Sequence, residues 1–346
     1  MWHVTVDTTD RRRQECRRST QECARHSCNP MLPVLLLVPL GATLLVAQKV
    51  PRTADGHPDL QGVWTNSTMT QLERPEQFAG KQTLTEAEAT AYEKSTIVQR
   101  DRDRRDGGAD VDVGRAYNEL FFDQGTKLAR LNGTIRTSMV IDPADGHIPA
   151  LTPEALKRQE ALRNEARLHP ADGPENRSLA ERCLFWATTG PPMLPGPYNN
   201  MYQIVQTPGA VMILSEMIHE TRIIPTDGRA HLPANMRKWT GDSIGHWEGD
   251  TLVVDTTNFT SKTRFRGSDE NLHVIERFTR VGPDTIDYKF TIDDPSVFTR
   301  SWTAELPLAA APGPIYEYAC HEGNYALLDI LTGARAQEKK AAGQAK

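Results

Sequence analysis

The stretch of residues 198–308 constrains the fold most strongly, because it is a succession of short apolar segments, each closed by a turn signal. The segments are rich in β-branched and aromatic residues, which is typical of successive antiparallel strands. The turn signals are Thr207-Pro208-Gly209, Thr226-Asp227-Gly228, Glu248-Gly249-Asp250 and Gly282-Pro283-Asp284. The pattern predicts a mainly β fold: an antiparallel barrel or strongly curved sheet of about eight to ten strands, with two or three peripheral helices.

The triplet Gly62-Val63-Trp64 suggests how this sheet begins. It is similar to the G-x-W opening of lipocalin-type barrels, in which the Trp closes one end of the barrel. The other interpretation is the first strand of any β-rich fold with a buried Trp. The lipocalin-like comparison concerns the fold alone and implies no function.

Two helical insertions are predicted inside one β-rich domain that covers residues 51–335. The first spans about 83–105, where Thr85 can cap the helix, and its closing RDRDRR run is interpreted as a solvated face. The second spans about 152–168 and begins at Thr152-Pro153-Glu154. Residues 336–346 are expected to be a disordered tail.

The N-terminus carries an uncharged apolar run at residues 32–47. The run has the size of a signal peptide and is short for a membrane span. We therefore expect residues 31–47 to be a signal peptide or a signal anchor, with Met31 as the true start and residues 1–30 unfolded. The protein should then be exported, to the periplasm or beyond, and should touch a membrane only through residues 31–47 if they are not cleaved.

Beyond residue 30 the chain has two cysteines, Cys183 and Cys320. Two cysteines in an exported protein most simply form a disulfide. The alternative is that Cys320, followed by His321 and Glu322, is a nucleophile with an adjacent base. Neighbouring residues on a strand rarely point at one another, so the disulfide is favoured.

Composition and missing motifs limit the classes of function. The net charge is −5 and no basic stripe is visible, so we expect no nucleic-acid partner. The sequence has no phosphate-binding glycine loop, no dinucleotide fingerprint and no G-x-S-x-G motif, so no cofactor is predicted. The histidines are spaced too irregularly for a known ligand motif, so no metal is predicted either. These are His219, His231, His246 and His273.

Candidate catalytic residues cluster near the end of a segment, 211–224, that we interpret as one strand. Adjacent residues on a strand point to opposite faces, so His219 lies on one face, and Glu220 and Arg222 lie on the other. Glu220 and Arg222 can form a pair, which is either structural or part of a site for a polar ligand. We expect this pair to face the barrel interior.

Two further acids, Asp255 and Glu276, lie on later strands among apolar neighbours. A buried acid needs a cationic partner, so one of them should lie within reach of Arg222. Aromatic residues are mostly expected in the core, although some could line a pocket for a flat apolar ligand. The candidate ligand-binding aromatics are Tyr202, Trp239, Tyr288 and Trp302.

Five phrases of the sequence resemble a family of exported, uncharacterised bacterial proteins with a β-rich domain. They are YNNMYQIVQ, MIHETRIIPTDGR, GHWEGDTLVVDTTNF, ERFTRVGPDT and YEYACHEGNY. The resemblance covers about residues 51–335 and implies export and a compact β-rich domain, but no activity.

Two classes of function remain for a protein of this pattern. One is a cofactor-independent enzyme (a lyase, an isomerase or a hydrolase) acting on a small organic molecule in a barrel pocket. His219 or an acid would then carry the proton, and Arg222 would stabilise an anion. The other is a non-catalytic periplasmic protein that binds a small ligand. The density of titratable residues around His219 favours the enzyme.

Overall fold

The structure is a computed structural model that describes residues 50–104, 107–114 and 122–344. Residues 1–30, the expected start at Met31 and the apolar run 31–47 lie outside the described residues. Within these ranges, every helix is too short or too polar to cross a membrane.

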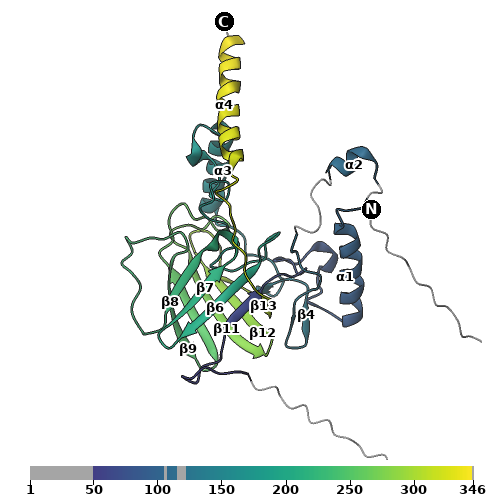
Figure 1. The fold of residues 1–346 in the computed structure, drawn as a ribbon, viewed down its shortest axis with the longest axis vertical. Helices are drawn as coiled ribbons and strands as arrows, with labels where there is room; N and C mark the ends of the chain where they lie inside the picture. The colour runs from purple at the N-terminus through teal and green to yellow at the C-terminus, as the bar shows by residue number, and fades with distance from the viewer. Residues whose placement is uncertain (1–49, 105–106, 115–121, 345–346) are drawn as a thin grey trace, which may run out of the picture. The chain divides into compact units, whose positions relative to one another are not determined.

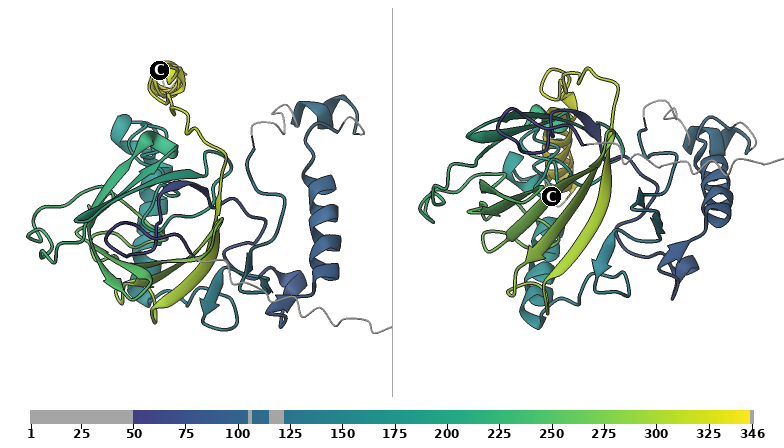
Figure 2. Two further views of the ribbon diagram at one scale, coloured as in Figure 1. Left: turned by 60° about the horizontal axis from the view of Figure 1, so that its bottom comes forward. Right: turned by 90° about the horizontal axis from the view of Figure 1, so that it is seen from below.

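In the described part of the chain, nine antiparallel strands form a nearly closed barrel (Figures 1 and 2). Their order around the barrel is β8-β7-β6-β1-β13-β12-β11-β10-β9. The bounds are β1 Gly62–Thr65, β6 Met201–Thr207, β7 Ala210–Ser215, β8 Thr221–Pro225, β9 Asp242–Glu248, β10 Thr251–Thr257, β11 His273–Gly282, β12 Thr285–Asp293 and β13 Trp302–Ala310. The mainly β class and the antiparallel barrel predicted from the sequence are confirmed.

Around the barrel the strands follow the order of the chain, and β1 lies between the next barrel strand, β6, and the last one, β13. Trp64 of β1 pairs with Tyr202 on one side and with Ala310 on the other. Three of the predicted turns join neighbouring strands in hairpins: β6 to β7, β9 to β10 and β11 to β12. The remaining turn signal follows β8 and opens the loop that leads to β9.

The two ends of the strand order, β8 and β9, approach each other closely. A side-chain carbon placed on Gly245 of β9 would lie 3.0 Å from the Cγ2 atom of Ile224 on β8. The absence of a side chain at Gly245 lets these strands come together, because a larger residue would push Ile224 away. Bringing the two edges together protects them from pairing with other chains.

Large side chains fill the barrel interior. Phe278 and Tyr288 have ring centroids 4.9 Å apart, and Phe290 and Trp302 have centroids 5.7 Å apart. All four side chains are fully buried, and Trp64 is also buried and donates its indole N–H to the Leu60 carbonyl at 2.9 Å. The interior is thus a packed core, and burial of each such side chain stabilises the fold by about 1.5–3 kcal/mol.

A small second sheet, of order β2-β4-β3, packs with helix α1 around a core of its own. Its strands are β2 Thr83–Leu84, β4 Thr134–Arg136 and β3 Arg130–Leu131. Helix α1 (Glu86–Arg100) begins at the predicted cap, where Thr85 and Glu88 form a reciprocal capping box. The helix predicted over about 83–105 is therefore present but shorter at both ends, because residues 83–84 form β2 and α1 ends at Arg100.

Other elements lie outside the barrel (Figure 1). Helix α3 (Pro153–Leu168) is capped by Thr152, as predicted, and the short helix α2 covers Ala109–Gly114. Strand β5 (Val140–Asp142) pairs with β13. Short 3-10 turns occur at Glu76–Phe78, Pro174–Asn176 and Met217–His219. The last helix, α4 (Tyr325–Gln344), continues through most of the range for which we expected a disordered tail.

The Pro-rich loop of residues 186–197 packs onto the barrel interior. The Met193 side chain is fully buried, and its backbone N–H donates to the Tyr288 hydroxyl at 2.9 Å. The Tyr202 hydroxyl in turn donates to the Thr188 carbonyl at 2.7 Å. The loop therefore seals the interior residues beneath it.

Cys183 and Cys320 form the predicted disulfide, with their Cα atoms 5.7 Å apart. The bond ties the segment before the Pro-rich loop to the segment before α4. Because its sulfur is bonded, Cys320 has no thiolate to act as a nucleophile.

Candidate functional site

The predicted strand of residues 211–224 is wrong, because the chain turns sharply in its middle. Strand β7 ends at Ser215 and β8 begins at Thr221, and the 3-10 turn Met217–His219 lies between them. Ile218 has φ 62° and His219 has φ 45°, so the backbone there is left-handed. His219 is consequently exposed on the turn, outside the barrel.

Arg222 lies in the barrel interior and pairs with Glu276, not with Glu220. Two parallel hydrogen bonds join the pair, Nη1 to Oε2 at 2.7 Å and Nη2 to Oε1 at 3.1 Å. Glu220 instead accepts a hydrogen bond from the Thr240 hydroxyl at 3.1 Å. The expectation that an acid lies within reach of Arg222 is confirmed for Glu276, and the Glu220–Arg222 pair is not formed.

A buried polar network surrounds this pair. The Tyr288 hydroxyl donates to Glu276 Oε1 at 2.8 Å, and burial raises the pKa of Tyr288 well above its usual value. Burial acts to lower the pKa of Arg222, but the Glu276 carboxylate outweighs it and raises that pKa. The network therefore holds a fixed guanidinium–carboxylate pair beneath the Pro-rich loop, sealed from solvent.

Asp255 belongs to a different cluster, which is half exposed. Its Oδ1 lies 3.0 Å from His231 Nε2, and its Oδ2 lies 3.0 Å from His273 Nε2. The hydrogen bond with His273 lowers the pKa of Asp255 and raises that of His273. Asp255 and Arg222, which the sequence suggested might converge, are therefore parts of separate networks.

The same cluster fastens the loop between β8 and β9. His231 Nδ1 lies 3.1 Å from Asp242 Oδ2, which also accepts the Leu232 backbone N–H at 2.9 Å. Burial acts to raise the pKa of Asp242, but the bonds from Leu232, Lys238 and His231 together lower it. These contacts hold the loop in place, and we call the group formed by Asp255, His231, His273 and Asp242 the latch. In the described ranges, no three His, Cys, Asp or Glu side chains are grouped so as to hold a metal ion.

The candidate ligand-binding aromatics are placed in two ways. Tyr202, Tyr288 and Trp302 are buried in the core, and Trp239 is half buried in the loop before β9. None of them lines either of the two cavities described next.

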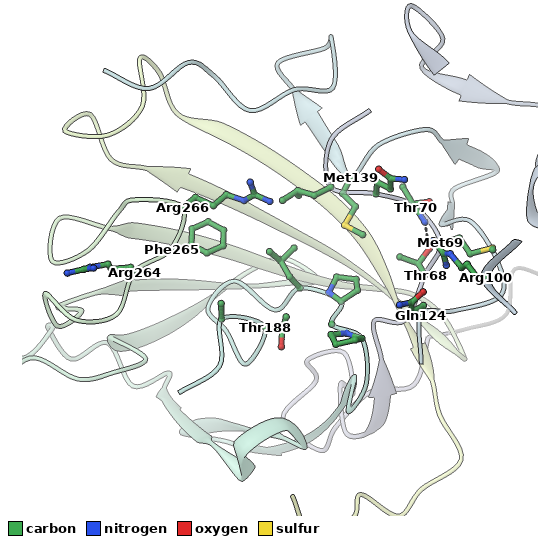
Figure 3. A pocket seen from close by; sticks show the side chains of 17 residues that line it. Thr68, Met69, Thr70, Arg100, Gln124, Met139, Thr188, Arg264, Phe265 and Arg266 are labelled. Carbon is green, nitrogen blue, oxygen red and sulfur yellow. Dashed lines mark hydrogen bonds between the residues drawn. The ribbon is translucent and has the colours of Figure 1, made fainter. Parts of the chain in front are cut away.

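A cavity of about 660 Å³ lies beside the outer surface of the Pro-rich loop (Figure 3). Its walls come from segments far apart in the sequence: the chain after β1, the end of α1, the Pro-rich loop and the loop after β10. The lining residues are Thr68, Met69, Thr70, Gln71, Leu72, Arg100, Gln124, Met139, Ala187, Thr188, Leu194, Pro195, Gly196, Pro197, Arg264, Phe265 and Arg266.

The described lining of this first cavity carries only positive charge. Three arginines, Arg100, Arg264 and Arg266, line it, and its described lining contains no acid and no histidine. The Nη1 atom of Arg100 is buried and has no hydrogen-bond partner among the described residues. A buried guanidinium nitrogen without an acceptor is costly, so an anion that reached it would be held strongly.

A second cavity, of about 510 Å³, adjoins the first. Both linings include Ala187 and Arg264. Three side chains of the second cavity, Arg182, Lys262 and Arg264, are cationic and have no ion-pair partner in the described residues. The other lining residues are Glu175, Arg177, Ser178, Leu179, Ala180, Phe185 and Ala187.

Sequence reasoning did not find these cations. Arg100 begins the RDRDRR run, which we interpreted as a solvated helix face, and that interpretation is wrong for Arg100. A signal was present in the segment SKTRFRG, where Lys262, Arg264 and Arg266 occupy alternate positions without an acid between them. Alternate positions of an extended segment share one side, so such a pattern predicts a concentrated positive charge.

We compared the chain with models of protein families, with curated proteins and with solved structures, and none of these comparisons gave a match.

Proposed function

We propose that this protein binds a small organic anion in the first cavity and has no catalytic activity. The observation that carries the proposal is the buried Nη1 of Arg100, which has no partner in the described ranges, in a described lining with three arginines and no acid. Guanidinium groups bind carboxylates and sulfonates through paired, charge-assisted hydrogen bonds. An anionic group is therefore the ligand chemistry that this lining favours.

The rest of the lining favours an apolar body attached to that anion. Apolar side chains alternate with a few hydroxyl and amide groups, which is usual for sites that bind small molecules. The apolar members are Met69, Leu72, Met139, Leu194, Pro195, Pro197 and Phe265. An aliphatic or aromatic carboxylate or sulfonate would satisfy both parts of the site.

Binding is favoured over turnover because the lining lacks a proton carrier. General acid–base catalysis needs a group such as His, Asp or Glu within hydrogen-bond reach of the ligand, and the described lining has none. His219, our candidate proton carrier, is exposed on the β7–β8 turn. Arg222, the candidate anion stabiliser, is engaged with Glu276 inside the barrel.

We further propose that the protein acts outside the cytoplasm. The Cys183–Cys320 disulfide supports an oxidising compartment, and the apolar run 31–47 supports export. The phrases that resemble exported bacterial proteins point to the same location, and membership of that family is part of this proposal.

Binding can be tested with 1-anilinonaphthalene-8-sulfonate, a fluorescent organic anion with an apolar body. We expect the full chain to bind it, and Arg100→Ala and Arg266→Ala each to weaken binding about 10- to 100-fold, as loss of a charge-assisted hydrogen bond implies. Arg229→Ala is the matched control, because Arg229 pairs with Asp227 on an exposed loop. Equal affinities in Arg100→Ala and Arg229→Ala would contradict the proposal.

A further inference from the structure

We propose that the ligand carries two anionic groups joined by an apolar chain, one group for each of the two adjoining cavities. This inference rests on the proposed function of the first cavity and extends it to the second. It assigns the second cavity as a binding subsite and names the ligand as an elongated organic dianion.

The first argument is the shared wall between the cavities. Ala187 lines both, and its side chain is a single methyl group, so it adds little bulk to the wall that the cavities share. Arg264 also lines both cavities. In Figure 3 the Arg266 side chain points toward Met139, whereas Arg264 extends in the opposite direction. The two arginines therefore serve different ends of the combined site.

The second argument is the segment that carries these cations. Lys262, Arg264 and Arg266 are exposed, whereas Thr263 and Phe265 between them are buried. Lys262 lines the second cavity, Arg264 lines both cavities and Arg266 lines the first. The row of charge therefore continues from the first cavity into the second.

The segment is held in place by its buried residues. The Thr263 hydroxyl donates to the Trp239 carbonyl at 2.8 Å. Phe265 and Ser268 exchange two backbone hydrogen bonds, each of 2.9 Å, and the Phe265 ring packs against Trp302 of the barrel core. The backbone that carries these cations is therefore fixed, so little backbone freedom remains to be lost on binding.

The third argument is the charge of the second cavity. Arg182 precedes Cys183 of the disulfide, and Asn324 donates to the neighbouring Glu181 carbonyl at 2.8 Å, so this backbone is fixed. Arg177 is neutralised by Glu181, and Glu175 is the acid in the lining. Arg182, Lys262 and Arg264 outnumber that acid, so the subsite retains a positive charge for a second anionic group.

The length of the apolar chain is set by the distance between the two subsites, so a series of ligands tests the inference best. We would displace bound 1-anilinonaphthalene-8-sulfonate from the full chain with α,ω-dicarboxylates from hexanedioate to hexadecanedioate. Each is compared with the monocarboxylate of the same carbon number. We expect at least one dicarboxylate to bind about tenfold tighter than its monocarboxylate, as one additional charge-assisted contact implies.

Variants then locate the second group. Arg182→Ala and Lys262→Ala should each reduce the advantage of the dicarboxylate without changing the affinity for the monocarboxylate, whereas Arg266→Ala should weaken both. Lys262 is exposed, so its variant tests the subsite even if Arg182→Ala does not fold. Arg229→Ala again serves as the control.

The possible failures are distinct. If monocarboxylates bind and depend on Arg100 and Arg266, but no dicarboxylate exceeds its partner, the second subsite is refuted and the proposed function stands. If the dicarboxylate keeps its higher affinity in both Arg182→Ala and Lys262→Ala, the second subsite is also refuted. If neither series displaces the probe, both the inference and the proposed function are refuted.

Discussion

Replacing Arg222 with Ala removes the cation from the sealed pair in the barrel. The side chain of Arg222 is 4% exposed and that of Glu276 is 0% exposed, so water cannot take the place of the guanidinium. Glu276 would keep the hydrogen bond from Tyr288 but lose both bonds from Arg222. Removing one partner of a buried pair costs about 3–5 kcal/mol, and we expect the free energy of unfolding to fall by that amount.

A matched control lies next to Glu276 on the same strand. Arg277 pairs with Glu248, and their side chains are 41% and 49% exposed. Arg277→Ala should therefore lower the free energy of unfolding by only about 0–1 kcal/mol. The two variants remove the same side chain from an ion pair, so the difference between them reports the burial of the carboxylate that is left behind.

A double variant separates the charge from the packing. Arg222→Met together with Glu276→Gln leaves no buried charge and keeps an acceptor for Tyr288, so its loss of stability should be smaller than the sum of the two single changes. Urea unfolding of the oxidised full chain, followed by tryptophan fluorescence and far-ultraviolet circular dichroism, measures the unchanged chain, Arg222→Ala, Arg277→Ala, Arg222→Met, Glu276→Gln and the double variant. The reasoning fails if Arg222→Ala falls within about 1 kcal/mol of Arg277→Ala, or if the single losses simply add.

Two further predictions concern the disulfide and the latch. Replacing Cys183 and Cys320 with Ser should lower the free energy of unfolding by about 4–5 kcal/mol in the chain-entropy model, because the bond joins residues 137 apart; unchanged urea midpoints would contradict this. The pKa of His273 is raised, so its pairing with Asp255 stabilises the fold below the usual His pKa, and this stability is lost as pH rises through the raised pKa. The pKa of Asp255 is lowered, so its contribution to stability is lost as pH falls through the lowered pKa. His273→Asn should therefore flatten the stability profile above the usual His pKa of about 6.5, and an unchanged profile would disprove the link.

The parts of the fold that were predicted depend on local chemistry. The turns at Pro208-Gly209, Gly249-Asp250 and Pro283-Asp284 and the caps at Thr85 and Thr152 each depend on residues close in sequence. The turn at Met217–His219 was missed because it places Ile218, a β-branched residue, in the left-handed region. That conformation is rare for such a residue, so the sequence gives no sign of it.

The candidate site could not be predicted in the same way. Its unpartnered nitrogen belongs to Arg100 at the end of α1, whereas Arg266 belongs to the loop after β10, and only the fold brings them to one cavity. The opposite case is the Arg222–Glu276 pair. The sequence indicated that a buried acid needs a cation, which was correct, but it could not tell that the pair would be sealed beneath residues 186–197.

The position of β1 has a consequence for how the chain reaches its native state. Trp64 pairs with Ala310, so β1, the first barrel strand to be synthesised, cannot complete its pairing until β13, the last one, has been made. Contacts between residues so distant in sequence make folding slow, because a long loop must close before they form. A chain that emerges from its N-terminus cannot close this barrel early. Barrel closure therefore comes only after β13 has been made, however early the hairpins form.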